Sequence, residues 1–315
     1  RAPTSPMLQP SHHSPHAARL GLLAACGAGF LWGTGALIVN VLMVRHGFTP
    51  ENISFWRFLV GAIVLLAVFA RPALWVKVRP RLGMVLLAGT CMAMYVLCWF
   101  LGIERIGASI PTLIALCLPP VLVTVWALLK GRERLDVSLV LALMAALGGT
   151  ALLVLRHGGG VPGGASGIAG ALVAGVAFSV ASAVLYAGFT LVSGRLSQDL
   201  GAGQSAACLT LVAAVVMGLS GFFRPLAWPA DVPPQAWFLY LGVVTAALAL
   251  LAFSWGAARL SPTALTVATL LEPLTAVVLA ALLLGEALAP LQWLGGALLI
   301  GSIWVLGQRG TAVHR

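Results

Sequence analysis

The second half of this chain repeats the first half at an offset of 154 residues. After one inserted residue the offset becomes 153, and the match continues to the end of the repeat. The matched pairs include Arg105 and Arg259, Thr112 and Thr266, Pro119 and Pro273, and Glu133 and Glu286. A period of this length is far too long for a solenoid, so the pattern predicts two fused copies of one unit.

Composition indicates what that unit is. Sixty per cent of the residues are apolar and only 8% are charged, whereas about a quarter of a soluble domain is charged. Runs long enough to cross roughly 30 Å of hydrocarbon occur at 18–44, 52–70, 82–103, 107–129, 137–155, 167–193, 204–223, 235–258, 262–284 and 290–307. Because these runs are continuous and do not alternate, they predict helices and not a barrel. The expected fold is an all-α polytopic membrane protein with ten transmembrane helices.

Five spans per repeat is an odd number, so the second copy enters the membrane from the opposite side, as in the inverted repeats of many transporters. The predicted organisation has a disordered N-terminal tail at 1–17 and a first five-helix repeat at 18–155. A Gly-rich linker at 156–166, a second five-helix repeat at 167–307 and a cytoplasmic tail at 308–315 complete it.

The basic residues set the expected orientation, because loops rich in Lys and Arg remain in the cytoplasm. With the N-terminus inside, the inner loops and tails hold thirteen basic residues and the outer loops hold four, namely Arg45, Arg105, Arg156 and Arg224. Both termini are therefore predicted to be cytoplasmic, in a bacterial inner membrane. The net charge of +10 suits contact with anionic membrane lipids and, without a basic helix outside the membrane, not nucleic acid.

Several sequence features argue against catalysis and bound cofactors. The predicted spans contain no His and no Asp, and the five cysteines within them are an odd set that does not suggest a disulfide framework. The glycine-rich stretch at 158–163 follows no strand, so it lacks the context of a dinucleotide site. No enzyme activity, no metal site and no cofactor are expected.

Glu272 is the only acidic residue within the predicted spans, and it lies about midway along the ninth. A carboxylate at that depth is costly unless it faces a partner or water, which makes it a candidate functional group. Pro273 beside it frees the backbone carbonyl four residues earlier. The alternative is a structural role, in which a hydrogen-bonded Glu272 holds two helices together.

Polar and aromatic residues of three other spans are predicted to line a cavity. Ser182, Tyr186 and Thr190 share one face of the sixth span, since they lie four residues apart. Tyr95 and Trp99 lie one turn apart in the third span, and Trp32 of the first span corresponds to Tyr186 in the repeat. Ordinary packing is the alternative for each. Arg57, one turn into the second span, is expected to extend to the outer membrane surface.

Taken together, these residues resemble a known family. Leu31-Trp32-Gly33, Tyr95 and Leu271-Glu272-Pro273, in two five-helix repeats, resemble the EamA-type carriers of the drug/metabolite transporter superfamily over about residues 20–307. The resemblance implies a central cavity lined by spans 1, 3, 4, 6, 8 and 9, and dimer contacts through the fifth and tenth helices. The chain departs from many relatives at Leu118, where they carry a second Glu.

The resemblance implies an exporter of amino acids and related small metabolites that works by alternating access. Its expected substrate-binding residues are Trp32, Tyr95, Trp99, Ser182, Tyr186, Thr190 and Glu272. The expected partners are a small-molecule substrate and membrane lipids, with the protein a monomer or homodimer. Export of cationic or aromatic drugs and passive conduction remain the alternative functions.

Overall fold

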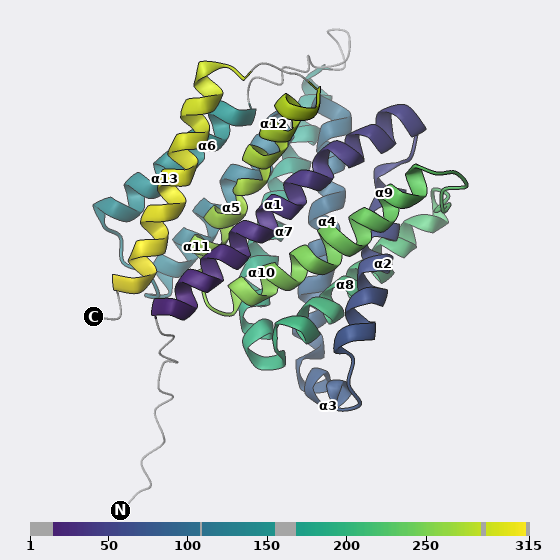
Figure 1. The fold of residues 1–315 in the computed structure, drawn as a ribbon, viewed down its shortest axis with the longest axis horizontal. Coiled ribbons are helices and arrows are strands. Elements are labelled where there is room, and N and C mark those ends of the chain that lie inside the picture. Colours follow the sequence, from purple (N-terminus) through teal and green to yellow (C-terminus); the bar gives the residue numbers. More distant parts are fainter. Residues whose placement is uncertain (1–14, 108, 155–167, 285–287, 313–315) are drawn as a thin grey trace, which may run out of the picture.

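The computed structural model describes residues 15–107, 109–154, 168–284 and 288–312, and every regular element within these ranges is a helix (Figure 1). The first half comprises α1 (Pro15–His46), α2 (Pro50–Phe69), α3 (Leu74–Val78), the short 3-10 helix η1 (Arg79–Arg81), α4 (Leu82–Ile106), α5 (Ser109–Leu129) and α6 (Val137–Val154). The second comprises α7 (Ile168–Leu200), α8 (Ala202–Gly218), the 3-10 helix η2 (Leu219–Phe222), α9 (Pro234–Tyr240), the π-helix η3 (Leu241–Leu248), α10 (Ala249–Ala257), α11 (Pro262–Thr269), α12 (Leu271–Leu284) and α13 (Pro290–Ala312).

Local sequence explains where several helices begin and end. Thr49 caps α2, because its side chain accepts a hydrogen bond from the amide of Asn52, and Pro50 occupies the first helical position. Ser261 and Pro262 do the same for α11. Gly107, with φ of +77°, terminates α4 in a backbone conformation that side-chain-bearing residues rarely adopt.

Nine helices in the described ranges are long and apolar enough to cross a membrane, and Pro290–Leu306 forms a shorter apolar helix. They match the predicted runs but extend further at several ends. One such span continues from Gly170 to Leu200 and another ends at Ile106. The prediction that Glu272 is the only acidic residue of a span is therefore wrong, since Glu51, Glu104 and Asp199 also lie in spanning helices, near their ends. The expectation that the spans contain no His and no Asp is wrong for the same reason, since Asp199, His16 and His46 lie at helix ends. The cause is that helices continue past the hydrocarbon into the polar headgroup region.

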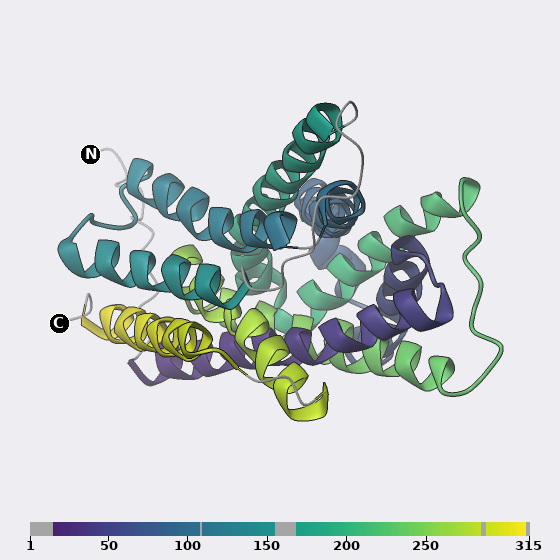
Figure 2. The same cartoon turned by 90° about the horizontal axis from the view of Figure 1, so that it is seen from above.

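The predicted boundaries of the terminal segments also shift. Helix α1 begins at Pro15, inside the stretch predicted as a disordered tail, and α13 continues to Ala312, inside the predicted C-terminal tail. The predicted linker at 156–166 lies outside the described residues. The beginning of α1 and the end of α13 lie on the same side of the molecule in two perpendicular views (Figures 1 and 2).

The principal helix contacts follow the sequence repeat. Helix α4 packs along α7, α1 along α10 and α12, and α5 along α7. Helices α2 and α8 pack against each other, as do α6 and α13. Exchanging each helix for its counterpart at the repeat offset reproduces this set of pairs: the α4 and α7 contact becomes that of α10 and α1, and the α5 and α7 contact becomes that of α12 and α1. The two halves therefore interleave and share one interior.

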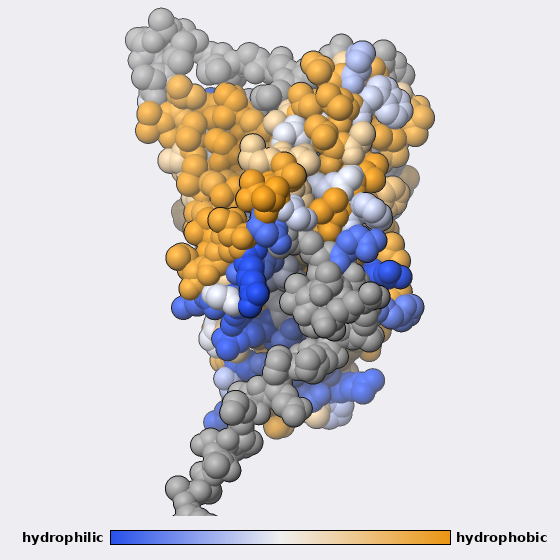
Figure 3. Space-filling view, turned by 90° about the vertical axis from the view of Figure 1, so that its left-hand side faces the viewer, coloured by the Kyte–Doolittle hydropathy of each residue, from blue (hydrophilic) through white to orange (hydrophobic). Residues whose placement is uncertain are grey.

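Much of the outer surface is apolar. Leu282, Val140 and Trp304 are among many large hydrophobic side chains that remain exposed. On the side of the molecule drawn in Figure 3, hydrophobic residues cover the upper zone and hydrophilic residues gather in the lower zone. An exposed apolar surface of this extent suits contact with lipid and not with water.

Candidate functional site

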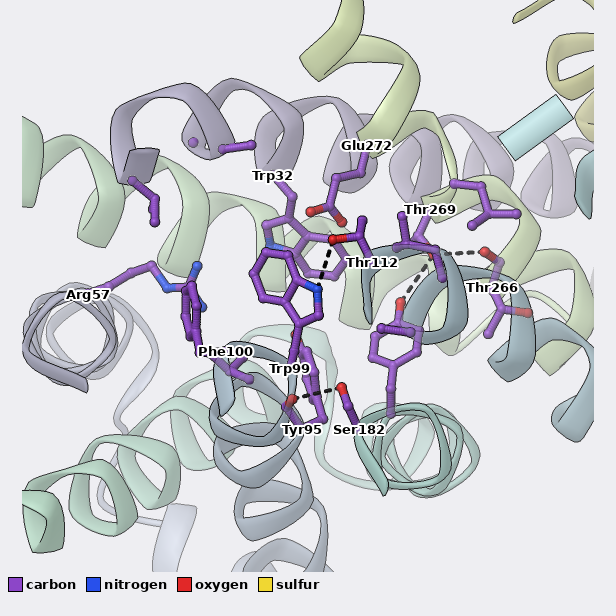
Figure 4. Close-up of a pocket in the computed structure, with 18 residues that line it drawn as sticks. Trp32, Arg57, Tyr95, Trp99, Phe100, Thr112, Ser182, Thr266, Thr269 and Glu272 are labelled. Atoms are coloured by element: carbon purple, nitrogen blue, oxygen red, sulfur yellow. Dashed lines mark hydrogen bonds between the residues drawn. The ribbon is translucent and has the colours of Figure 1, made fainter. Parts of the chain in front are cut away.

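A cavity of about 160 Å³ lies in the interior that the two halves share (Figure 4). Helices α1, α2, α4 and α5 of the first half and α7, α11 and α12 of the second supply its walls. Its polar and aromatic lining comprises Trp32, Arg57, Tyr95, Trp99, Phe100, Thr112, Ser182, Tyr186, Thr266, Thr269 and Glu272. The small residues Gly35, Ala36 and Ala115 complete the wall and leave space that larger side chains would fill.

Aromatic rings form one wall of the cavity, and hydrogen bonds fix their positions. The rings of Tyr95 and Tyr186 meet edge to face with centroids 5.0 Å apart. Trp99 donates its indole N–H to the hydroxyl oxygen of Thr112 at 3.1 Å (Figure 4). Ser182 donates to the backbone carbonyl of Tyr95 at 2.8 Å, which ties α7 to α4. Rings held in this way present a preformed apolar surface to a ligand.

Trp32 takes its orientation from the π-helix η3. Its indole N–H donates to the carbonyl of Thr245 at 2.9 Å, within a segment where the helix winds more loosely. The ring of Phe253 lies behind that of Trp32, with centroids 5.6 Å apart. The eighth span was expected to line the cavity, but it contributes no lining residue, because Trp32 lies between it and the cavity.

Threonine hydroxyls form the opposite wall. The hydroxyls of Tyr186 and Thr269 lie 3.1 Å apart, and Thr269 donates to the carbonyl of Thr266 at 2.9 Å. These bonds join α7 to the end of α11, where Leu270 separates α11 from α12. The ninth span is therefore divided into two helices beside the cavity, with Leu270 between them in helical backbone angles (φ −64°, ψ −4°).

Glu272 lies in the first turn of α12, directly after this interruption. Pro273 follows it and removes the backbone donor that would have bonded to the carbonyl of Thr269, so the helix ladder is open there. The carboxylate lines the cavity, and no hydrogen bond or ion pair joins it to another described residue. The first turn of a helix favours a negative charge. This position leaves the carboxylate free to meet a ligand.

Glycines of α1 allow the interrupted helix to approach closely. A Cβ atom added to Gly29 would lie 2.7 Å from the carbonyl oxygen of Thr269, and one added to Gly33 would lie 2.6 Å from that of Glu272. Both distances are shorter than van der Waals contact. The Gly29 and Gly33 pair thus permits the helix contact that places Glu272 at the cavity.

The position of Arg57 differs from the one expected from the sequence. The residue was expected to extend to the outer membrane surface, yet its side chain lines the cavity (Figure 4). The guanidinium carbon lies 4.8 Å from the centre of the Phe58 ring. The reason is that α2 packs against α8 and η3, which turns this face of α2 toward the interior.

Six of the seven predicted binding residues line the cavity, and Thr190 does not. Thr190 is buried, and its hydroxyl donates to the carbonyl of Tyr186 in its own helix at 2.9 Å. The prediction missed Arg57, Phe100 and the three threonines. The repeat held a signal for two of the threonines, because Thr112 and Thr266 recur at the same offset as the prolines.

No group of His, Cys, Asp and Glu in the described ranges has the arrangement needed to hold a metal ion. All five cysteines are free. Within the residues described, the polar chemistry of the cavity is therefore one carboxylate, one guanidinium and a set of hydroxyl and indole groups.

Several known proteins resemble this chain over most of its length. An uncharacterized transporter of Bacillus subtilis (strain 168), YwfM, is 30% identical over 291 residues, covering 89% of this chain and 90% of the relative. A protein of Streptantibioticus cattleyicolor, described as a probable terminal-alkyne amino-acid exporter, is 30% identical over 282 residues, covering 85% of this chain and 88% of its own. A solved crystal structure shares the fold with a TM-score of 0.76 at 22% identity, over 92% of this chain and 98% of that one.

The model of the EamA-like transporter family matches residues 19–155 and again 173–308. The two matches coincide with the two sequence repeats and together cover most of the chain. This multi-pass membrane protein belongs to the EamA-like transporter family.

Proposed function

We propose that this protein exports amino acids and related small metabolites across the bacterial inner membrane by alternating access. The observation that carries the proposal is the cavity itself: both halves contribute to it, and it combines aromatic walls with an unpaired carboxylate at an interrupted helix. Interrupted helices at the interface of two repeats are where secondary transporters bind substrate.

The proposed architecture is ten spans in two inverted five-helix repeats, with α13 as the tenth span. The exchange symmetry of the helix contacts supports it. Alternating access then follows if the two halves rock about the cavity, opening it first to one side and then to the other.

Both termini are proposed to be cytoplasmic, as the excess of basic residues on one set of loops requires. The placement of the first and last described helix ends on one side of the molecule supports this (Figures 1 and 2). A Lys77→Cys variant, with the five native cysteines replaced, tests it in intact cells. Labelling by a membrane-impermeant maleimide only after cell lysis is the expected result, and labelling of intact cells would contradict the orientation.

The size of the cavity and the description of one relative support an amino-acid substrate. At about 160 Å³ the cavity is smaller than the roughly 300–1,000 Å³ of sites for drug-sized ligands. The Streptantibioticus relative is described as a probable exporter of an amino acid. A mainly apolar and aromatic surface gives weak discrimination between side chains that differ by a methylene, so a broad range of amino acids is expected.

Transport in proteoliposomes tests the proposed function. Vesicles containing the purified protein are given labelled leucine, with and without unlabelled leucine on the far side. A carrier accelerates labelled uptake by counterflow, whereas a passive channel does not. Absence of uptake for every amino acid in a panel, with uptake of cationic aromatic drugs instead, would favour the drug-export alternative, for which the aromatic walls around Glu272 are the favourable feature.

A further inference from the structure

The cavity holds two charged side chains of opposite sign. Of its eighteen lining residues, only Arg57 and Glu272 are charged. They come from opposite halves of the chain, Arg57 from α2 and Glu272 from α12. No ion pair or hydrogen bond joins them.

Within the described residues, no hydrogen bond satisfies the Nε atom of Arg57, which is inaccessible to solvent. The guanidinium carbon lies 4.8 Å from the centre of the Phe58 ring, which offers no hydrogen-bond acceptor. A guanidinium has five N–H donors in a fixed fork. A buried donor without a partner is costly, so a site that keeps one in this state is suited to a ligand that supplies the acceptor.

The neighbouring residues direct that fork into the cavity. In the view of Figure 4, Arg57 extends from α2 toward the centre of the cavity, and the indoles of Trp32 and Trp99 lie between it and Glu272. The two charged groups and the two indoles therefore border the same cavity. A ligand that meets both charges must carry an anionic group and a cationic group, with apolar atoms near the rings.

We propose that Arg57 binds the carboxylate of the substrate and determines specificity for zwitterionic α-amino acids, whose ammonium group is bound by Glu272. The inference rests on the proposed transport function and narrows its substrate class. A carboxylate accepts two parallel hydrogen bonds from a guanidinium, which gives both affinity and orientation.

Charge balance supports a zwitterion over singly charged ligands. The pair of Arg57 and Glu272 leaves the lining with no net charge, and a zwitterion preserves that balance. A cation that meets Glu272 instead adds a second positive charge to a cavity of low dielectric constant, where repulsion from Arg57 is strong. Amino-acid amides and cationic drugs are thus disfavoured.

The first test changes the ligand and keeps the protein unaltered. Proteoliposomes of the wild-type protein are assayed with leucine, with leucinamide, which lacks the carboxylate, and with 4-methylpentanoate, which lacks the ammonium group. Leucine is expected to be transported at least about tenfold faster than either analogue, as expected for loss of one charged hydrogen-bonded group. Equal rates for leucine and leucinamide would overturn the role of Arg57 while leaving the transport function intact.

The second test changes the protein. Arg57→Gln is expected to lower leucine uptake by about tenfold or more and to leave leucinamide uptake unchanged or increased. Arg57→Lys, which keeps the charge but loses the fork, should lie between the wild type and Arg57→Gln. Arg105→Gln is the matched control, because Arg105 also lies over a ring, that of Phe178 at 4.6 Å, but does not line the cavity.

The outcomes separate the two proposals. Equal loss of leucine and leucinamide transport in Arg57→Gln, at normal folded yield, would overturn carboxylate binding. If Arg57→Gln does not fold, thermal stabilisation of the wild-type protein in detergent by leucine, but not by leucinamide, supports the inference, and equal stabilisation by both contradicts it. Failure of the wild-type protein to transport any of the three ligands would instead refute the proposed amino-acid export.

Discussion

The fourth and ninth spans occupy matching places in the two repeats but differ in form. Pro119 of α5 corresponds to Pro273 of α12, yet α5 is continuous from Ser109 to Leu129 and the ninth span is divided at Leu270. The residue before the proline is Leu118 in one and Glu272 in the other. A proline alone therefore does not determine whether a span is divided, because both spans have a proline at the matching position and only the ninth span is divided.

The packing partners of these spans explain the difference. Helix α7 packs along α5, and α1 packs along the ninth span. The residues of α1 that approach the ninth span are Gly29 and Gly33, and alanines stand at the matching positions of α7, 183 and 187. The glycines leave room for the backbone at Thr269 and Glu272 to approach α1. Both spans lose ladder hydrogen bonds at their prolines, but only the ninth span is divided at Leu270 and carries a charge beside the division.

The largest effect on transport is expected when Glu272, which has no acidic counterpart in the fourth span, is replaced by glutamine. Glu272→Gln should lower the initial rate of leucine uptake by about tenfold to a hundredfold, as expected when a charged group that binds the ligand is lost. The Tm in detergent should change little, because glutamine keeps the volume of the side chain. Leu118→Gln, at the matching position outside the cavity, is the control and should transport at nearly the wild-type rate.

The opposite pattern would assign Glu272 a structural role. If Glu272→Gln transports normally while Glu272→Leu loses folded yield, the carboxylate holds the interrupted helix in place. The aromatic and hydroxyl groups of α1, α4 and α7 would then carry the binding.

A second prediction concerns the contact between α1 and the ninth span, which is given the alanine found in the matching contact between α7 and α5. Gly29→Ala introduces the Cβ that Ala183 already has in α7, but here it meets the carbonyl oxygen of Thr269 at 2.7 Å. The free energy of unfolding should fall by about 1–3 kcal/mol through overpacking, measured as a lower Tm. Gly27→Ala, whose Cβ meets nothing within 4 Å, should leave the Tm unchanged. Equal Tm values for both variants would show that the close approach of α1 does not constrain the ninth span.

A third prediction compares two matched threonines. Thr112 accepts the indole N–H of Trp99 at 3.1 Å, whereas Thr266 donates to the carbonyls of Pro262 and Thr263 in its own helix. Thr112→Val leaves the indole N–H of Trp99 without its acceptor, so the free energy of unfolding should fall by about 1 kcal/mol. Leucine should also bind more weakly, because Trp99 is no longer held in position. Thr266→Val removes only local bonds and should cost less. Denaturation in detergent and ligand titration measure both, and a larger loss in Thr266→Val would refute the assignment.

The smallest effect is expected at the contact between α7 and α11. Tyr186→Phe removes the hydroxyl that lies 3.1 Å from that of Thr269, but Thr269 still donates to the carbonyl of Thr266. Because no buried donor loses its partner, the free energy of unfolding should fall by about 0.5 kcal/mol at most, the low end for a single hydrogen bond. A loss of several degrees in Tm would mean that this bond, and not ring packing, holds the interrupted helix against α7.

The sequence predicted most of the helices, because hydrophobic length is a direct requirement of the bilayer and is visible residue by residue. It also identified Glu272 as a candidate functional residue, since burying an acidic side chain in a long apolar run costs free energy whichever neighbouring helix it points toward. The ends were less predictable: Glu104 and the last turns of α7 belong to helices that continue beyond the apolar runs.

Arg57 and Thr190 show what the sequence left undetermined. Their types and positions in a span do not say which side chains reach the cavity: Arg57 was expected at the outer surface and lines it, whereas Thr190 was expected to line it and is buried one turn away from Tyr186. That choice depends on contacts between residues far apart in the chain, such as those of α2 with α8 and η3.

By itself, then, the sequence determined that this chain is a duplicated helical membrane protein with one acidic group deep in its ninth span. Only the tertiary structure decided which span is divided near its proline, which side chains share a cavity, and that an arginine from the other half lines the same cavity as that acid. The physical reason is that apolar length and the cost of burying charge are local properties of a segment. The cavity, by contrast, is produced by the packing of two interleaved halves.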